Sequence, residues 1–310
     1  MKRLLIFLSL VLPLAMSACD DDNEDVTTTP LTITSENAQQ VTSAVWNTTA
    51  DANDLGQISE KTIEDLIIRA EQSQAATVTA TALGISLDFL VNCDSGSVNI
   101  SWGDGDDNTK PTPGDTFTFK FLECFLESAG ATLNGTMSLT LKPEVGTGPT
   151  RIGLAADIRF SSLQVSTDSE QFIADGDATL IAGALVPEDT SLLGVRLSGD
   201  SLTLKQANNA ATLSGYSLQK TIDPLVQTRP YTVQLNGTLA TTELGGSVEF
   251  NTEQVLQGVG DEPPTSGVLL IQGSNLTNGL NATLRVTAIG EGKVRLELDA
   301  TTETTWDQIL

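Results

Sequence analysis

Several polar residues in one loop have a spacing that could bind a metal ion. Asp104, Asp106 and Asn108 stand at alternate positions, and such a run of carboxylate and amide oxygens opens the common helix-loop-helix calcium loop. That pattern next requires glycine where Thr109 stands, and it places its last acidic ligand where Asp115 stands. Because the glycine is missing, we expect a solvated hairpin loop, and a weak calcium site of another type is the alternative.

The sequence lacks the residues or motifs of most other catalytic sites. The chain has no histidine, which excludes a histidine base, a histidine metal ligand, and Ser-His-Asp or Cys-His catalysis within this chain. Its 40 acidic residues make chance carboxylate pairs plentiful. Asp157, between Ala156 and Ile158, has the most apolar neighbours, but a polar strand position explains it better. Neither a Ser-x-x-Lys motif in a helical context nor a glycine-rich nucleotide loop is found, so we expect no enzyme and no cofactor.

The first eighteen residues have the features of an export signal. Lys2 and Arg3 precede an apolar run over residues 4–14, which is shorter than the roughly 20 residues that a membrane-spanning helix needs. Small residues, Ser17 and Ala18, then precede Cys19. The segment 14–19 resembles the lipobox of bacterial lipoproteins, although methionine stands where leucine is most common. The resemblance implies cleavage before Cys19 and lipidation of its thiol, with acyl chains such as palmitate. An ordinary signal peptide followed by a chance cysteine is the alternative.

Residues 19–34 are predicted to form a flexible acidic tether. They begin with Cys-Asp-Asp-Asp-Asn-Glu-Asp, a composition that buries too little apolar surface to fold. Removal of residues 1–18 takes away two of the sixteen basic residues, so 14 basic residues face 40 acidic ones. This charge argues against nucleic-acid binding. We expect a membrane attachment through the N-terminal lipid, at the outer membrane or the periplasmic face of the inner membrane.

Two cysteines, Cys93 and Cys124, remain after the anchor. An oxidising compartment makes a disulfide the default for such a pair, and two buried free thiols are the alternative. Without histidine the pair is a poor zinc site. The bridge would close a loop of about thirty residues and contribute on the order of 3–4 kcal/mol in the chain-entropy model.

The remaining pattern predicts a mainly β protein. Residues 35–85 are expected to form a helical segment, with helices near 36–46 and 59–70, Ser35 and Ser59 as caps, and a turn over 51–56. From about residue 86 the apolar positions alternate, which is typical of antiparallel strands with one wet face. We therefore predict a large, curved antiparallel β domain over residues 86–310, either a sandwich or an open barrel. Two similar fragments, 133–137 and 235–239, are explained either by duplication of a β unit or by strands of similar composition. Their mid-strand glycines indicate bulges or a close approach of the backbone.

An ordered series of turns also resembles a group of uncharacterised lipoproteins of Gram-negative bacteria. The series comprises residues 93–97, 114–116, 124, 133–136, 245–248, 264–267 and the ending Trp-Asp-Gln-Ile-Leu. The chain departs from that group in lacking a Gly-Asp-Gly turn between Leu298 and Trp306. The resemblance implies a fold and a cellular address, and no activity.

Three functions follow as hypotheses. The first is a non-enzymatic lipoprotein of the cell envelope that acts as a structural or interaction module toward an unknown envelope protein. The second is a carrier that holds a lipid or another apolar ligand in a curved sheet. A carrier requires a continuous apolar cavity of roughly 300–1,000 Å³, whereas a structural module fills that space with its own side chains. A carboxylate-based hydrolase is the third.

Overall fold

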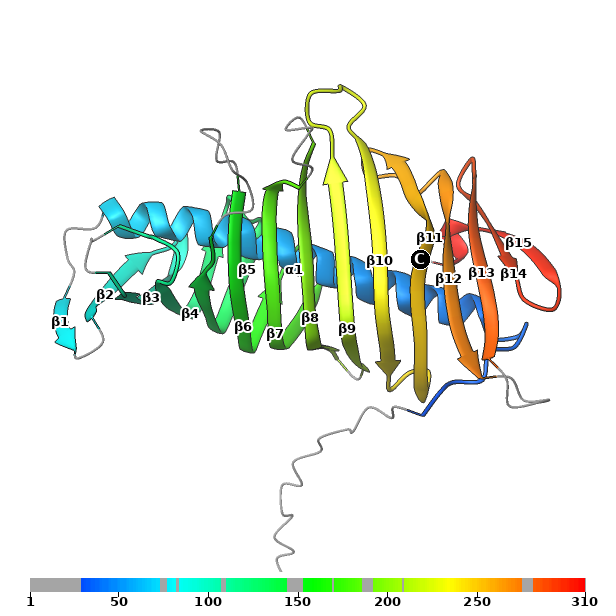
Figure 1. The fold of residues 1–310 in the computed structure, drawn as a ribbon, viewed down its shortest axis with the longest axis horizontal. Helices are drawn as coiled ribbons and strands as arrows, with labels where there is room; N and C mark the ends of the chain where they lie inside the picture. Colours follow the sequence, from blue (N-terminus) through cyan, green and yellow to red (C-terminus); the bar gives the residue numbers. More distant parts are fainter. Residues whose placement is uncertain are drawn as a thin grey trace, which may run out of the picture.

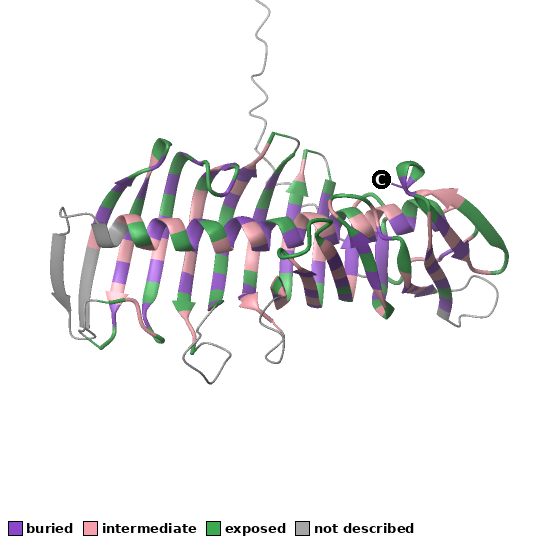
Figure 2. Cartoon of the chain, turned by 90° about the horizontal axis from the view of Figure 1, so that it is seen from above, coloured by how far each residue is buried: buried purple, intermediate pink, exposed green. Residues whose placement is uncertain are grey.

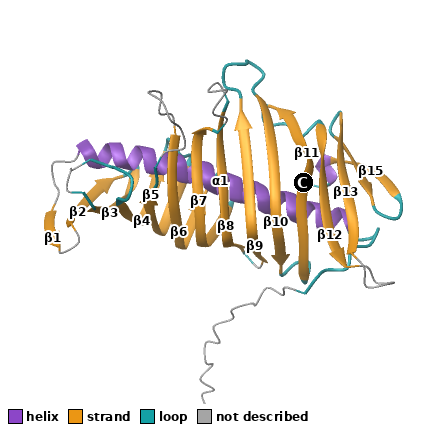
Figure 3. Cartoon of the chain, viewed as in Figure 1, coloured by secondary structure: helices purple, strands orange, loops and turns teal. Residues whose placement is uncertain are grey.

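A computed structural model shows one long curved sheet with one long helix lying against it (Figures 1 and 3). It describes residues 29–72, 77–81, 84–106, 110–143, 153–168, 170–185, 192–207, 209–274 and 281–309. The lipidation residue Cys19 and the predicted ligand Asn108 therefore lie outside the described residues.

The described strands follow one another as neighbours in a single antiparallel meander. Their bounds are β1 (Thr77–Thr81), β2 (Gly84–Asn92), β3 (Ser95–Asp104), β4 (Thr116–Leu126), β5 (Ala131–Leu141), β6 (Gly153–Ser166), β7 (Gln171–Ala184), β8 (Leu193–Gln206), β9 (Asn209–Ile222), β10 (Pro230–Thr241), β11 (Gly246–Val259), β12 (Ser266–Ser274), β13 (Asn281–Gly290), β14 (Lys293–Glu297) and β15 (Thr301–Thr305). The order in space is the order in sequence. Among the described residues no pairing joins β1 to β15, so the sheet is open. The predicted curved antiparallel β fold is confirmed.

Interruptions in the pairing occur near the middle of many strands. The register shifts between Asn134 and Thr136, and again between Asn236 and Thr238. These are the two similar fragments, and their glycines have positive φ, +104° at Gly135 and +149° at Gly237. A Cβ at Gly135 would lie 2.3 Å from a backbone oxygen of the neighbouring strand. The expectation that mid-strand glycines mark bulges is confirmed, and bulges bend a strand.

The sheet curves around helix α1 (Ala38–Gln72), and we call its helix-facing surface the trough. At 1.5 Å per residue the 35 residues span about 52 Å. Figure 2 shows α1 crossing the strands one after another. The buried apolar side chains of the helix and of the inner strand face form one core, whose helical members include Val41, Val45, Ala52, Leu55, Ile63 and Leu66.

The helical prediction was wrong in three respects. One helix runs through residues 51–56, where a turn was expected. Thr34, rather than Ser35, exchanges hydrogen bonds with Asn37 at the start, in the manner of a capping box (2.8 and 3.3 Å). The helix ends at Gln72 and β1 begins at Thr77, so the last part of the predicted helical segment 35–85 is sheet.

The two long edges of the trough are formed by alternate connections. The lower rim holds the turns 93–94, 127–130, 167–170 and 242–245, and the upper rim holds the loops 105–115, 223–229 and 260–265. The chain enters α1 from the lower rim, where Leu31 N donates to Ser247 O and Ser247 N donates to Thr29 O (2.8 Å each). The loop 223–229 stands at the top of Figure 1 and this entry lies near the bottom. The end of the predicted flexible tether is thus paired with β11.

Candidate functional site

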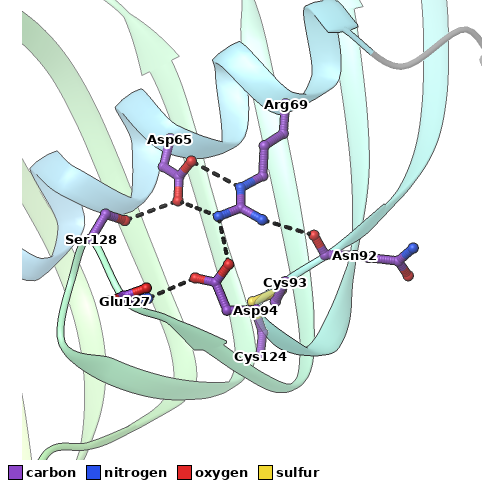
Figure 4. The surroundings of a disulfide bond; sticks show 8 residues. All are labelled: Asp65, Arg69, Asn92, Cys93, Asp94, Cys124, Glu127 and Ser128. Atoms are coloured by element: carbon purple, nitrogen blue, oxygen red, sulfur yellow. Dashed lines mark hydrogen bonds and ion pairs between the residues drawn. A yellow bond between two sulfur atoms is a disulfide. The ribbon is translucent and has the colours of Figure 1, made fainter.

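The predicted disulfide is present and joins the turn after β2 to β4. Cys93 and Cys124 are bonded, with their Cα atoms 5.4 Å apart and both side chains buried. The alternative of two free thiols is therefore wrong. The bond fastens two hairpins of the lower rim beneath the last turn of α1 (Figure 4).

An ion cluster next to this bond holds the end of the helix. Arg69 Nε lies 2.9 Å from Asp65 Oδ1, and Arg69 Nη2 lies 3.1 Å from Asp94 Oδ1. Glu127 N donates to Asp94 at 2.8 Å, and Ser128 Oγ donates to Asp65 at 2.9 Å. Figure 4 shows these groups converging from α1 and the two hairpins. The hydrogen bonds from Arg69 lower the pKa of Asp65, so the cluster is ionised and its groups are paired. We call it, with the disulfide, the clamp.

The predicted metal loop is partly assembled at the upper rim. Asp104, Asp106 and Asp115 bring carboxylate oxygens within 4.8 Å of one another. Asp104 and Asp115 are each only 1 % exposed. The structure thus brings Asp104 and Asp106 close to Asp115, which stands at the last ligand position of the calcium-loop pattern. Carboxylate oxygens are the ligands that hard cations prefer.

Asp115 also has a structural role in this loop. Its carboxylate accepts hydrogen bonds from Trp102 Nε1 (3.2 Å), Gly105 N (3.0 Å) and Thr112 N (3.0 Å). These bonds tie the beginning of the loop to its end. They account for the burial of Asp115 without a bound ion, so the calcium site remains a prediction.

The carboxylate singled out for hydrolysis has an ordinary surface position. Asp157 accepts hydrogen bonds from Lys142 Nζ and Thr179 Oγ1, both at 2.7 Å, and its side chain is 53 % exposed. The hydrogen bond from Lys142 lowers its pKa. A general acid needs the opposite shift, so Asp157 gives no support to a glycosidase.

Carboxyl groups with raised pKa values occur instead in the middle of α1, where the sequence did not suggest them. Burial, together with the charge and hydrogen bond of Glu170, raises the pKa of Asp51 to about 7. Burial and the charge of Glu64 raise the pKa of Glu60 to about 7. Asp51 also accepts a hydrogen bond from Gln206 at the lower rim (2.8 Å). These groups take up protons near neutrality because the trough removes them from water.

The same stretch of α1 carries buried polar atoms with no partner in the described part of the chain. They are Asn53 Oδ1, Ser59 Oγ and Thr62 Oγ1. With Gly56 they form a stripe at intervals of three residues. A Cβ at Gly56 would lie 3.0 Å from Val195 Cγ1, so this stripe packs tightly on the apolar trough floor. A buried polar atom without a partner costs about 1–3 kcal/mol and therefore calls for a functional or structural reason.

No family model matches the chain, and no curated protein or solved structure is similar to it. Within the described residues no helix is both long and apolar enough to cross a membrane.

Proposed function

We propose that this chain is a non-enzymatic lipoprotein of the cell envelope, anchored through Cys19, whose folded body is an interaction module. The observation that carries the proposal is the position of α1, which lies along the trough. A carrier of a large lipid leaves that space to its cargo, whereas a module of this kind fills it with its own side chains.

Contacts at both ends of α1 support a permanently filled trough. Near the beginning, the rings of Trp46 and Trp306 lie 5.0 Å apart, and Gln39 Nε2 donates to Gln308 O at 2.5 Å. At the other end the clamp holds Arg69. These contacts join the helix to segments that are far away in sequence. Removal of α1 from the trough would therefore break the contacts at both of its ends.

The position of the tether favours an interaction surface on the upper rim. The chain reaches β11 at Thr29 on the lower rim, ten residues after Cys19. Ten extended residues reach at most about 36 Å. The β11 end of the lower rim therefore lies within this distance of the bilayer in an anchored body, and the upper rim, with the loops 223–229 and 260–265, is on the opposite edge of the sheet, where other envelope components can reach it.

Fractionation of a Cys19→Ser variant tests the anchor. We expect loss of labelling by a radioactive or clickable fatty acid, and recovery of the protein in the soluble fraction. The double variant Cys93→Ser/Cys124→Ser is the matched control and should keep its label. A Cys19→Ser protein that stays in the membrane fraction would contradict the proposal.

Photo-crosslinking in intact cells tests the interaction surface. A crosslinking residue at Leu225, on the upper rim and 80 % exposed, should give one dominant protein adduct. The same residue at Glu243, on the lower rim, is the control and should give weaker or different adducts. Absence of a discrete adduct at Leu225 would argue against an interaction module.

The second candidate, a carrier of an apolar ligand, is favoured by one observation. A cavity of about 310 Å³ with mainly apolar walls lies beside α1 at the upper rim. It is much smaller than the trough, so it suits a small ligand instead of a two-chain lipid.

A further inference from the structure

Two adjoining chambers lie between the middle of α1 and the upper rim. The first has a volume of about 310 Å³ and the second about 200 Å³. Lys220 on β9 lines both, so its side chain stands at their junction. We call the two chambers together the rim groove.

The first chamber suits an apolar chain. Its apolar walls come from β8, from β9 and from the loop that follows β9, namely Leu193, Val195, Ile222 and Pro224. Gln57, Glu60 and Arg229 complete the lining together with Lys220. In the adjacent loop, the side chains of Leu225 and Val226 are exposed by 80 % and 42 %. Large apolar side chains in water next to an apolar cavity are typical of a binding surface.

The second chamber has a mixed lining that includes a buried amide oxygen without a hydrogen-bond partner among the described residues. Asn53 lines it, is 6 % exposed, and has an Oδ1 atom without a partner among the described residues. Asp54 lies one residue further along, and burial raises the pKa of its carboxyl group although Lys220 acts to lower it. Asp54 Oδ1 accepts a hydrogen bond from Gln57 Nε2 at 3.4 Å, whereas Asn53 Oδ1 has no donor among the described residues. The aromatic walls are Trp46 and Tyr231.

The junction carries positive charge. Lys220 Nζ lies 5.6 Å from the ring centre of Tyr231, whose hydroxyl donates to Glu262 O at 2.6 Å. Arg229 lines the apolar chamber on the loop side. A ligand that passes from one chamber to the other therefore meets apolar walls first, then a cation, and then hydrogen-bond acceptors.

We propose that the rim groove binds a single-chain zwitterionic amphiphile. The apolar chain occupies the first chamber, an anionic group lies at Lys220, and a cationic donor group at the far end lies at the carboxyl group of Asp54 and next to the side-chain amide of Asn53. A purely anionic amphiphile leaves Asn53 unpaired and brings its charge toward Asp54. A purely cationic one faces Lys220. This ligand site goes beyond the proposed interaction function, because that function rests on the filled trough and the anchor.

Calorimetric titration with three probes of equal chain length tests the head-group requirement. The full-length Cys19→Ser protein is titrated, without detergent and below the critical micelle concentrations, with decylphosphoethanolamine, decyl phosphate and decylamine. We expect the zwitterionic probe to bind about tenfold tighter than either other probe, a difference of about 1.4 kcal/mol. If no probe binds at millimolar concentration, or if all three bind equally, the proposal is wrong.

Matched variants test whether the probes bind in the rim groove. Lys220→Gln should weaken binding of the two phosphate-bearing probes by about tenfold and should strengthen binding of decylamine, because the variant removes a like charge that faces it. Lys205→Gln, on the exposed lower end of β8, is the control and should bind like the parent. A Lys220→Gln protein with unchanged affinities would place the site elsewhere and overturn the proposal.

Asn53→Leu separates recognition from folding. The variant removes an unpaired buried oxygen, so its melting temperature should rise while its affinity for the zwitterionic probe falls several-fold. A raised melting temperature with full affinity would show that Asn53 does not contact the ligand, and would overturn that part of the proposal. All these readouts use unlipidated protein, so they fail or succeed independently of the Cys19 anchor.

Discussion

The last turn of α1 and its middle are held in the same trough by different means. At the last turn, Asp65 and Arg69 form short hydrogen bonds to two hairpins that a disulfide joins. In the middle, Asn53, Ser59 and Thr62 each bury an oxygen atom without a partner among the described residues. The first region has the properties of a structural clamp. The second region lowers the stability of the fold, and one of its members, Asn53, lines the rim groove.

This difference separates residues that maintain the fold from residues that are available for binding. Polar groups at the clamp satisfy one another, so they have no capacity left for a ligand. Unsatisfied groups next to a cavity are typical of sites where stability and function conflict. We therefore expect mutations in the two regions to change stability in opposite directions.

Loss of the disulfide should have the largest effect. Cys93 and Cys124 are separated by 31 residues, so the double variant Cys93→Ser/Cys124→Ser is expected to lose about 3–4 kcal/mol of unfolding free energy. Guanidinium denaturation of both proteins under non-reducing conditions measures the difference. A loss below about 1 kcal/mol would show that the bridge adds little to the clamp.

Removal of the clamp arginine should have the next largest effect. Arg69→Met keeps the aliphatic stem but breaks the pairs to Asp65 and Asp94, which are partly exposed, so we expect a loss of about 1 kcal/mol. Arg159→Met is the matched control, because Arg159 is 70 % exposed and lies 3.7 Å from Asp177. Equal midpoints of urea unfolding for the two variants would remove the distinction between clamp and surface pair.

Substitutions in the middle of α1 should stabilise the protein. Ser59→Ala and Thr62→Val remove unpaired buried hydroxyls, and each is expected to raise the unfolding free energy by about 1 kcal/mol. Thr49→Val is the control and should not stabilise, because Thr49 Oγ1 donates to Val45 O at 2.8 Å. Lower stability of Thr62→Val than of the parent would show that its hydroxyl has a partner such as bound water.

The smallest effect concerns pH. The pKa of Glu60 rises from an ordinary 4.5 to about 7 on folding, so its favourable contribution is complete at acidic pH and is lost as pH rises through 7. Glu60→Gln should therefore raise the melting temperature at pH 8 by about 2–4 °C and leave it nearly unchanged at pH 5. Asp65→Asn should lower the melting temperature equally at pH 5 and pH 8, because the pKa of Asp65 is lowered from an ordinary 3.8 and its contribution is lost only at more acidic pH. Equal shifts at both pH values for Glu60→Gln would contradict its burial.

Much of the sheet could be predicted, because alternation of apolar residues is a local property. The hairpin of β13 and β14 and the bulges at Gly135 and Gly237 lie where their residues indicate. Strand β12 was missed because residues 268–271, Val-Leu-Leu-Ile, form a continuous apolar run without alternation. The short edge strand β15, Thr301–Thr305, has no apolar positions to alternate.

The helix and the sites depend on contacts that no local pattern contains. Asp51, Asn53 and Gly56 favour a turn by propensity, but packing against the trough overrides this preference, and the absence of a side chain at Gly56 leaves room for Val195. The carboxylate cluster was indicated in part, since Asp104, Asp106 and Asp115 stand at ligand positions of the calcium-loop pattern, but only the fold shows that these three meet. The rim groove joins α1, β8 and β9, so the sequence could not indicate it.

Hydrogen–deuterium exchange of the full-length protein tests most directly whether α1 fills the trough. Amides of residues 41–67 should exchange as slowly as those of β7, β8 and β9, and within the helix the middle should exchange faster than the clamped last turn. Rapid exchange throughout α1, with protection of the strands retained, would show that the helix leaves the trough in solution, and would favour the carrier over the interaction module.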